Sequence, residues 1–234
     1  MKLATLLSYA TSAALLAGAA SAQPDILVPS GSLDGIFRLV DRNGNDAYDY
    51  LINGVDSSIR NIVLVPGTPP RLYCTSTVME QVLSFWDADG NGVIDVTTEL
   101  TVALDFNVFF GTTGTAAHEV NSIAHAGQGV FYVTNDGGSS EGIWRCEDLN
   151  GDGDFYDTVG GVVETTPAAA EPSTLTVTNA PNDGNPSLLL DQLDSIQFDP
   201  TWGNGRFILE EERFDFTMAV EDLNGDGDFL DANE

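Results

Sequence analysis

Four stretches of the sequence gather oxygen-bearing side chains in a pattern suited to a hard cation. Each begins with Asp and has Asp or Asn at its third and fifth positions; they are residues 41–49, 87–95, 148–157 and 222–231. Calcium takes about six to eight oxygen ligands at about 2.3–2.6 Å, and glycine permits the sharp turn that such a loop needs. Carboxylates this close repel one another unless a cation lies between them. The pattern therefore predicts Ca²⁺ loops.

The second loop resembles the calcium hairpins of integrin α-subunit propellers, the FG-GAP repeats. The resemblance implies side-chain ligands at loop positions 1, 3, 5 and 9 and a backbone carbonyl at position 7. In this chain these are Asp87, Asp89, Asn91, Asp95 and the carbonyl of Val93. The first loop has Asp41, Asn43, Asn45 and Asp49 at the four side-chain positions. Asp46 replaces its glycine, which makes it the weakest of the four.

The third and fourth loops end in an acid that is shifted by one residue. Tyr156 and Leu230 stand at position 9, so Asp157 and Asp231 can serve only if each loop bulges by one residue. The predicted metal-binding residues are Asp148, Asn150, Asp152, Asp154 and Asp157 in the third loop, and Asp222, Asn224, Asp226, Asp228 and Asp231 in the fourth.

The loops differ from EF-hands, in which position 12 is a bidentate glutamate. Here that position holds Ile52, Thr98, Val159 or Asn233, and no flanking helices are indicated. Mg²⁺ fits less well because it tends to keep its waters. For any single loop, the alternative is an ordinary Asn/Asp/Gly turn.

A short strand in constant register leads into each loop. Positions two and four residues before the first Asp are apolar or cysteine; they are Leu39 and Phe37, Phe85 and Leu83, Cys146 and Trp144, and Val220 and Met218. The intervening residues are mixed; they include Arg38, Ser84, Arg145 and Ala219. One face of each strand is therefore expected to pack and the other to be at least partly open.

Two further strand patterns recur before the last three loops. A Ser-Ile marker ends at Ile59, Ile123 and Ile196, and apolar runs follow at 71–74, 130–133 and 206–209. The segments after the loops, of which 160–186 is the longest, have room for a fourth strand. This repetition predicts an all-β, antiparallel repeat architecture that is propeller-like with about four blades. A β-sandwich of hairpins is the alternative.

The expected organisation is a signal peptide followed by one β-repeat domain. Residues 1–22 combine Lys2, an apolar run and a small-residue cleavage box, as secretory signal peptides do. The domain spans 23–234, with units at about 23–54, 55–119, 120–186 and 187–234. The mature protein is expected to be secreted, extracellular or periplasmic, with no membrane span.

The first and last units are both incomplete in the sequence. The first lacks a marker strand, and the last has no outer strand after its loop. Either the run 25–28 completes the last blade and closes a ring, or strand edges stay open for another molecule, or the chain is a fragment of a longer array.

The charge balance excludes some classes of partner. Lys2 is the only lysine, so the mature chain has seven arginines against 36 acidic residues, a balance of −29. Such a charge disfavours nucleic acid and anionic membranes and favours divalent cations. An acidic surface adapted to a saline habitat is compatible with the same composition.

Few residues suggest catalysis. The string 138–142 matches G-x-S-x-G but lacks a strand-to-helix elbow, and His118 and His125 lack zinc-site spacing. Residues 210–212 read as a solvated charge run. Cys74 and Cys146 lie on apolar strand faces, where they could form a disulfide or stay buried as small hydrophobes.

The sequence favours an exported calcium-binding module with a structural or extracellular binding and adhesion role over an enzyme. Besides calcium, the candidate partners are a glycan, an extracellular protein, or another copy that pairs through open strand edges. The alternative is a calcium-dependent propeller-type hydrolase or lyase that uses a channel carboxylate, His125 or a calcium-bound water.

Overall fold

The computed structural model describes residues 26–30, 35–39, 49–53, 59–67, 69–91, 94–111, 118–136, 142–170, 176–178, 187–189, 193–201, 206–211 and 216–221. These residues form antiparallel sheets and one short helix, α2 (Phe106–Phe110). The prediction of an all-β, antiparallel chain is confirmed. The predicted signal peptide, residues 1–22, lies outside the described residues.

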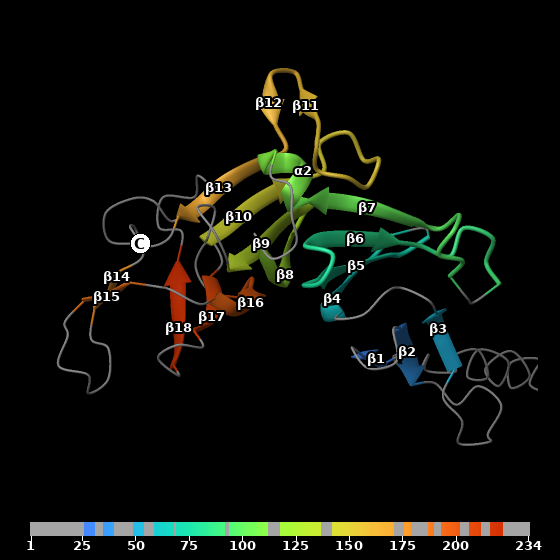
Figure 1. Cartoon of the computed structure of the whole chain (residues 1–234), viewed down its shortest axis with the longest axis horizontal. Coiled ribbons are helices and arrows are strands. Elements are labelled where there is room, and N and C mark those ends of the chain that lie inside the picture. Colours follow the sequence, from blue (N-terminus) through green and yellow to red (C-terminus); the bar gives the residue numbers. More distant parts are fainter. Residues whose placement is uncertain are drawn as a thin grey trace, which may run out of the picture.

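Four meander sheets follow one another along the chain (Figure 1). Sheet one contains β1 (Ile26–Ser30), β2 (Gly35–Leu39) and β3 (Asp49–Asn53), and sheet two contains β4 (Ile59–Val65), β5 (Arg71–Ser76), β6 (Gln81–Phe85) and β7 (Leu100–Asp105). Sheet three contains β8 (Glu119–Gly127), β9 (Val130–Asp136), β10 (Gly142–Glu147) and β13 (Thr165–Ala170). Sheet four contains β16 (Leu193–Asp199), β17 (Arg206–Glu211) and β18 (Phe216–Glu221). Two small hairpins also form: β11 (Thr158–Val159) with β12 (Val162–Val163), and β14 (Thr176–Thr178) with β15 (Ser187–Leu189).

The strands that lead into the loops have equivalent positions in three sheets. Leu83 pairs with Cys74, Trp144 with Val133, and Met218 with Leu209. Leu83, Trp144 and Met218 all lie four residues before a loop Asp, so sheets two, three and four align residue by residue at these strands. In sheets two and three, a fourth strand follows the loop, β7 and β13 respectively.

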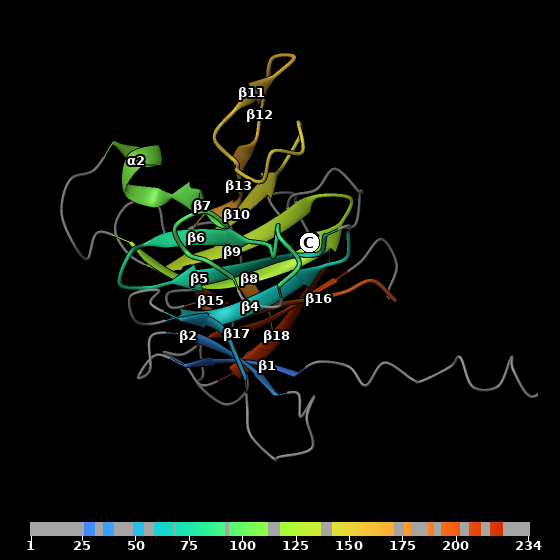
Figure 2. The same ribbon diagram turned by 90° about the vertical axis from the view of Figure 1, so that its right-hand side faces the viewer.

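The marker strands of neighbouring sheets lie side by side. Strand β8 contacts both β4 and β16 (Figure 1, Figure 2). Asn121 of β8 bonds to both neighbouring sheets, because its backbone carbonyl accepts from Thr75 Oγ1 of β5 at 2.9 Å and its Nδ2 donates to the Leu193 carbonyl of β16 at 3.3 Å. The sheets are thus joined at their first strands.

The structure decides one question about the chain ends. Strand β1 pairs with β2, with Val28 opposite Phe37, so residues 26–28 of the predicted run 25–28 contribute to sheet one and do not complete the last sheet. Among the described strands the four sheets form a series and no closed ring.

The expected open strand face is wrong for sheet two. Ser84 is fully buried and Arg145 is half-buried, whereas Ala219 of sheet four is exposed. Sheets two and three have neighbours on both sides, and a face covered by another sheet buries whatever side chains it carries. The side chain of Arg38 lies outside the described residues.

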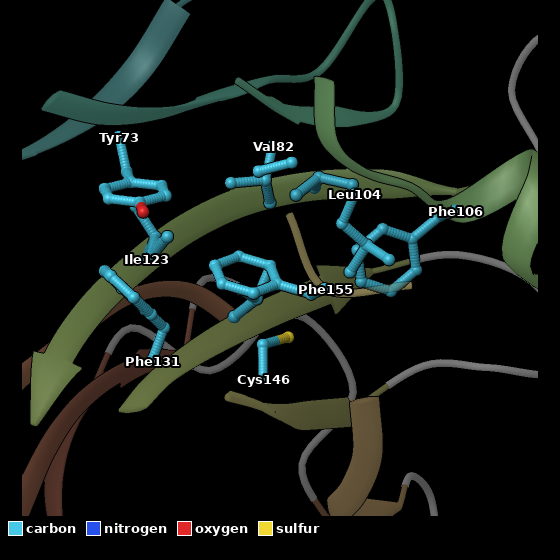
Figure 3. Packing of buried hydrophobic residues seen from close by; sticks show 11 residues of the cluster. Tyr73, Val82, Leu104, Phe106, Ile123, Phe131, Cys146 and Phe155 are labelled. Atoms are coloured by element: carbon cyan, nitrogen blue, oxygen red, sulfur yellow. The ribbon is translucent and has the colours of Figure 1, made fainter. Parts of the chain in front are cut away.

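The face that was expected to pack does so in sheets two, three and four; the side chains of sheet one lie outside the described residues. Phe85 and Leu83 belong to a cluster on one face of sheet two, Cys146 to the cluster between sheets two and three, and Val220 to the cluster between sheets three and four. Figure 3 shows the middle cluster, in which side chains from both sheets meet, among them Tyr73, Phe131 and Phe155.

The two cysteines do not form a disulfide. Both are free and buried, Cys74 and Cys146 belong to different clusters, and each behaves as a small hydrophobe. Burial raises the pKa of the Cys146 thiol to about 12 and raises that of Cys74 as well.

Candidate metal centre

The second loop brings three carboxylates together at the end of β6. Asp87, Asp89 and Glu99 each offer an oxygen, and these oxygens lie within 4.8 Å of one another. The backbone N–H of Asn91 donates to Asp87 Oδ1 at 3.1 Å and to Asp89 Oδ1 at 3.0 Å, which holds both side chains over the turn. Three of the predicted residues, Asp87, Asp89 and Asn91, therefore converge.

Asp95 and Val93 are the other two predicted ligands of this loop. The Asp95 carboxylate accepts from the Thr97 N–H and hydroxyl at 2.8 and 2.6 Å, and these bonds lower its pKa. It lies outside the group formed by Asp87, Asp89 and Glu99. Val93 lies outside the described residues.

Glu99 is a site residue that sequence reasoning missed. It lies directly before β7 and is buried, with 4% of its surface exposed. Its Oε1 accepts from the backbone N–H groups of Ala88 and Asp89 at 2.7 and 3.2 Å, and its Oε2 accepts from that of Asp95 at 2.8 Å. Through these hydrogen bonds, the buried side chain of Glu99 holds both ends of the loop next to the start of β7.

The third loop is fastened in the same way by Glu164, directly before β13. Its Oε1 accepts from the Leu149 N–H at 2.9 Å and its Oε2 from the Asp157 N–H at 2.8 Å. The backbone bonds also correspond, because Trp86 donates to the Glu99 carbonyl at 3.2 Å and Glu147 donates to the Glu164 carbonyl at 2.8 Å. Glu99 and Glu164 are equivalent residues of two repeats.

This equivalence identifies the bulge in the third loop. Asp95 and Asp157 occupy the same place: each donates its N–H to the glutamate carboxylate, and each carbonyl accepts the glutamate's N–H, at 2.7 Å and 3.1 Å respectively. Asp95 is the ninth residue of its loop and Asp157 the tenth of its own. The third loop thus contains one extra residue before its final acid.

The other polar side chains of the third loop form hydrogen bonds within the loop. Asp148 accepts from the N–H groups of Gly151 and Gly153 at 2.6 and 3.0 Å. Both glycines have positive φ, 80° and 99°, which permits this turn. Asn150 Nδ2 donates to Asp152 Oδ2 and Asp157 Oδ2, both at 2.8 Å, so these two carboxylates share one neighbour.

Two acids at the third loop have a raised pKa. Burial, together with nearby carboxylates, raises the pKa of Asp154 and of Glu164. Asp154 also accepts from the Tyr156 N–H at 3.1 Å. Among the described residues, the acids of the third loop do not converge as Asp87, Asp89 and Glu99 do. A cation beside them would relieve the repulsion between their charges.

The remaining predicted residues fall outside the description. Asp41, Asn43 and Asn45 of the first loop, and Asp222, Asn224, Asp226, Asp228 and Asp231 of the fourth, are not described; Asp49 begins β3, but its side chain is not described. Residues 138–141 of the G-x-S-x-G string also lie outside the described residues.

The two histidines lie against aromatic rings. His118 is buried beside Phe110, with ring centroids 5.1 Å apart, and His125 of β8 lies 4.9 Å from Phe131. Burial lowers the pKa of both imidazoles. Both histidines therefore have the environment of core side chains.

No protein-family model matches the chain, and the search of curated proteins finds no match. Among the described residues, no helix has the length and apolar character needed to cross a membrane.

The two glutamates make a testable prediction about loop order. We expect Glu164→Ala to speed hydrogen exchange at the Leu149 and Asp157 amides, because both lose their acceptor. Glu99→Ala should do the same at Ala88 and Asp95. Two-dimensional NMR measures both, and each variant is the control for the other loop. Unchanged exchange at the amides of the mutated loop would show that the glutamate does not hold it.

Proposed function

We propose that this chain is an exported calcium-binding β-repeat protein in which the Asp/Asn loops, among them those between β6 and β7 and between β10 and β13, bind Ca²⁺. The observation that carries the proposal is the pair of equivalent loops, each held by a glutamate from the strand that follows. An Asn/Asp/Gly turn alone needs no such buried acid. The repetition supports a built site rather than a chance match.

The donor set fits calcium. Asp87, Asp89 and Glu99 offer hard carboxylate oxygens within 4.8 Å of one another. Ligands around one Ca²⁺ are about 2.3–2.6 Å from the ion, so opposite oxygens are about 5 Å apart. The Asn91 side-chain oxygen and backbone carbonyls of the loop would supply further ligands. Calcium would neutralise the clustered charge of these loops.

The sheets would be the blades of a propeller-like repeat. Each is a meander, and the first strands β4, β8 and β16 adjoin one another. These contacts favour the propeller-like arrangement over a sandwich of hairpins, which has only two facing sheets. In this proposal calcium rigidifies loops at one end of each blade.

The biological role that fits is structural or adhesive, outside the cell. The signal-peptide pattern supports export. The charge of −28 for the full chain disfavours anionic surfaces as partners. The candidate partners are a glycan, an extracellular protein, or a second copy that pairs with the outer edge of β18, which is the last strand of its sheet among the described strands.

Isothermal titration with CaCl₂ tests the proposal directly. We expect Asp89→Asn and Asp148→Asn each to weaken one site by at least about tenfold, because a charged ligand is lost. Glu210→Gln is the matched control, since Glu210 is exposed on β17 and belongs to no loop. Wild-type protein that takes up no calcium would refute the proposal. Loss of affinity in Glu210→Gln equal to that in the loop variants would also refute it, because the effect would then be one of net charge.

A further inference from the structure

The third loop differs from the second in what its apolar residues contact. In the second loop, Ile94 is buried in the cluster formed by sheet two itself. In the third loop, Phe155 is fully buried and packs between sheets two and three, with its ring 5.9 Å from Tyr73 of β5 and 5.2 Å from Phe131 of β9 (Figure 3). The third loop therefore reaches across to the preceding sheet.

Hydrogen bonds fix this crossing. The Phe155 N–H donates to the Ala103 carbonyl of β7 at 2.9 Å. The neighbouring Tyr156 hydroxyl accepts from the Asp105 N–H, also of β7. On the other side, Thr165 of β13 donates its hydroxyl to the Phe155 carbonyl at 2.9 Å. Two adjacent loop residues are thus bonded to two different sheets.

A third contact brings sheet two against the turn of the loop. Gly153 is buried, and a Cβ at this position would lie 1.7 Å from Arg71 Nη1. The same guanidinium lies over the Trp86 ring, 4.7 Å from its centre, directly before the second loop. With a φ of 99°, Gly153 has a backbone conformation that favours glycine, and the Arg71 side chain of sheet two packs directly against it.

We infer that Phe155 and Tyr156 are positioning residues that make the third loop a latch between sheets two and three, so that cation binding by the loop and docking of the two sheets favour each other. The inference rests on the proposed function, because it concerns calcium at the third loop. Phe155 and Tyr156 lie between Asp154 and Asp157, so undocking them displaces these acids. Linkage is reciprocal: if docking strengthens calcium binding, calcium must strengthen docking by the same factor.

The test is an NMR titration of the full chain with CaCl₂. The Gly90 amide reports the second loop and the Gly153 amide the third. We expect Tyr156→Phe to weaken calcium binding at the third loop about two- to tenfold, because the Asp105 N–H loses its acceptor. The second loop should keep its affinity. Tyr132→Phe is the control, because Tyr132 belongs to the cluster between sheets three and four.

Hydrogen exchange at the Phe155 amide supplies a second measurement that needs no variant. Saturating CaCl₂ should slow this exchange at least about tenfold, since opening requires the latch to release. Unmoved Gly90 and Gly153 amides in the wild-type protein would overturn the proposed function itself. Movement of both amides with unchanged affinity in Tyr156→Phe and unchanged Phe155 exchange would overturn the latch alone.

Discussion

Removal of calcium with a chelator is expected to lower the free energy of unfolding by about 2.7 kcal/mol for each loop that was held at a hundredfold excess over its Kd. The second and third loops together would then contribute about 5 kcal/mol. For a chain of this size, the melting temperature should fall by about 10–20 °C. The physical reason is that the ion binds the assembled loops and has little affinity for the unfolded chain.

The measurement is thermal unfolding by circular dichroism at low ionic strength, with CaCl₂ and with chelator. A variant that carries both Asp87→Asn and Asp148→Asn is the matched control, because its melting temperature should respond much less. Added MgCl₂ should restore only a small part of the loss, because Mg²⁺ tends to keep its waters. An unchanged melting temperature of the wild-type protein after chelation would contradict calcium binding.

Replacement of Phe155 by alanine is expected to destabilise the fold by about 3–5 kcal/mol. The ring is fully buried and contacts Tyr73 and Phe131 from two sheets, so its removal leaves a cavity that neither sheet can fill alone. Chemical denaturation of the calcium-loaded protein measures the change. The result bears on the latch, because a loop residue would then stabilise the join between sheets two and three.

Two variants make the Phe155 result interpretable. Phe155→Leu keeps most of the apolar volume and should cost less than about 1.5 kcal/mol. Val159→Ala changes an exposed residue just after the loop and should stay within about 0.5 kcal/mol. A loss below about 1 kcal/mol in Phe155→Ala would mean that the ring does not join the sheets.

The equivalence of Glu99 and Glu164 could not be predicted from their spacing in the sequence. Glu99 follows Asp95 by four residues, whereas Glu164 follows Asp157 by seven, because the hairpin β11–β12 lies between them. Alignment by spacing therefore does not pair the two. A weaker signal in the sequence could have identified them. In both units a glutamate stands directly before the fourth strand, and strand formation does not require a glutamate at this position.

The sequence by itself determined the strands that lead into the loops, the equivalent positions of their apolar residues, and the Asp/Asn composition of the loops. These depend on alternation and turn chemistry, which act between residues close in the chain, and so Leu83, Trp144 and Met218 occupy equivalent places in three sheets. Tertiary structure alone decided that Ser84 is buried, that β1 pairs with β2, and that Phe155 bridges two sheets. Each of these features depends on contacts between segments that are far apart in the chain. Such contacts have no characteristic spacing in the sequence.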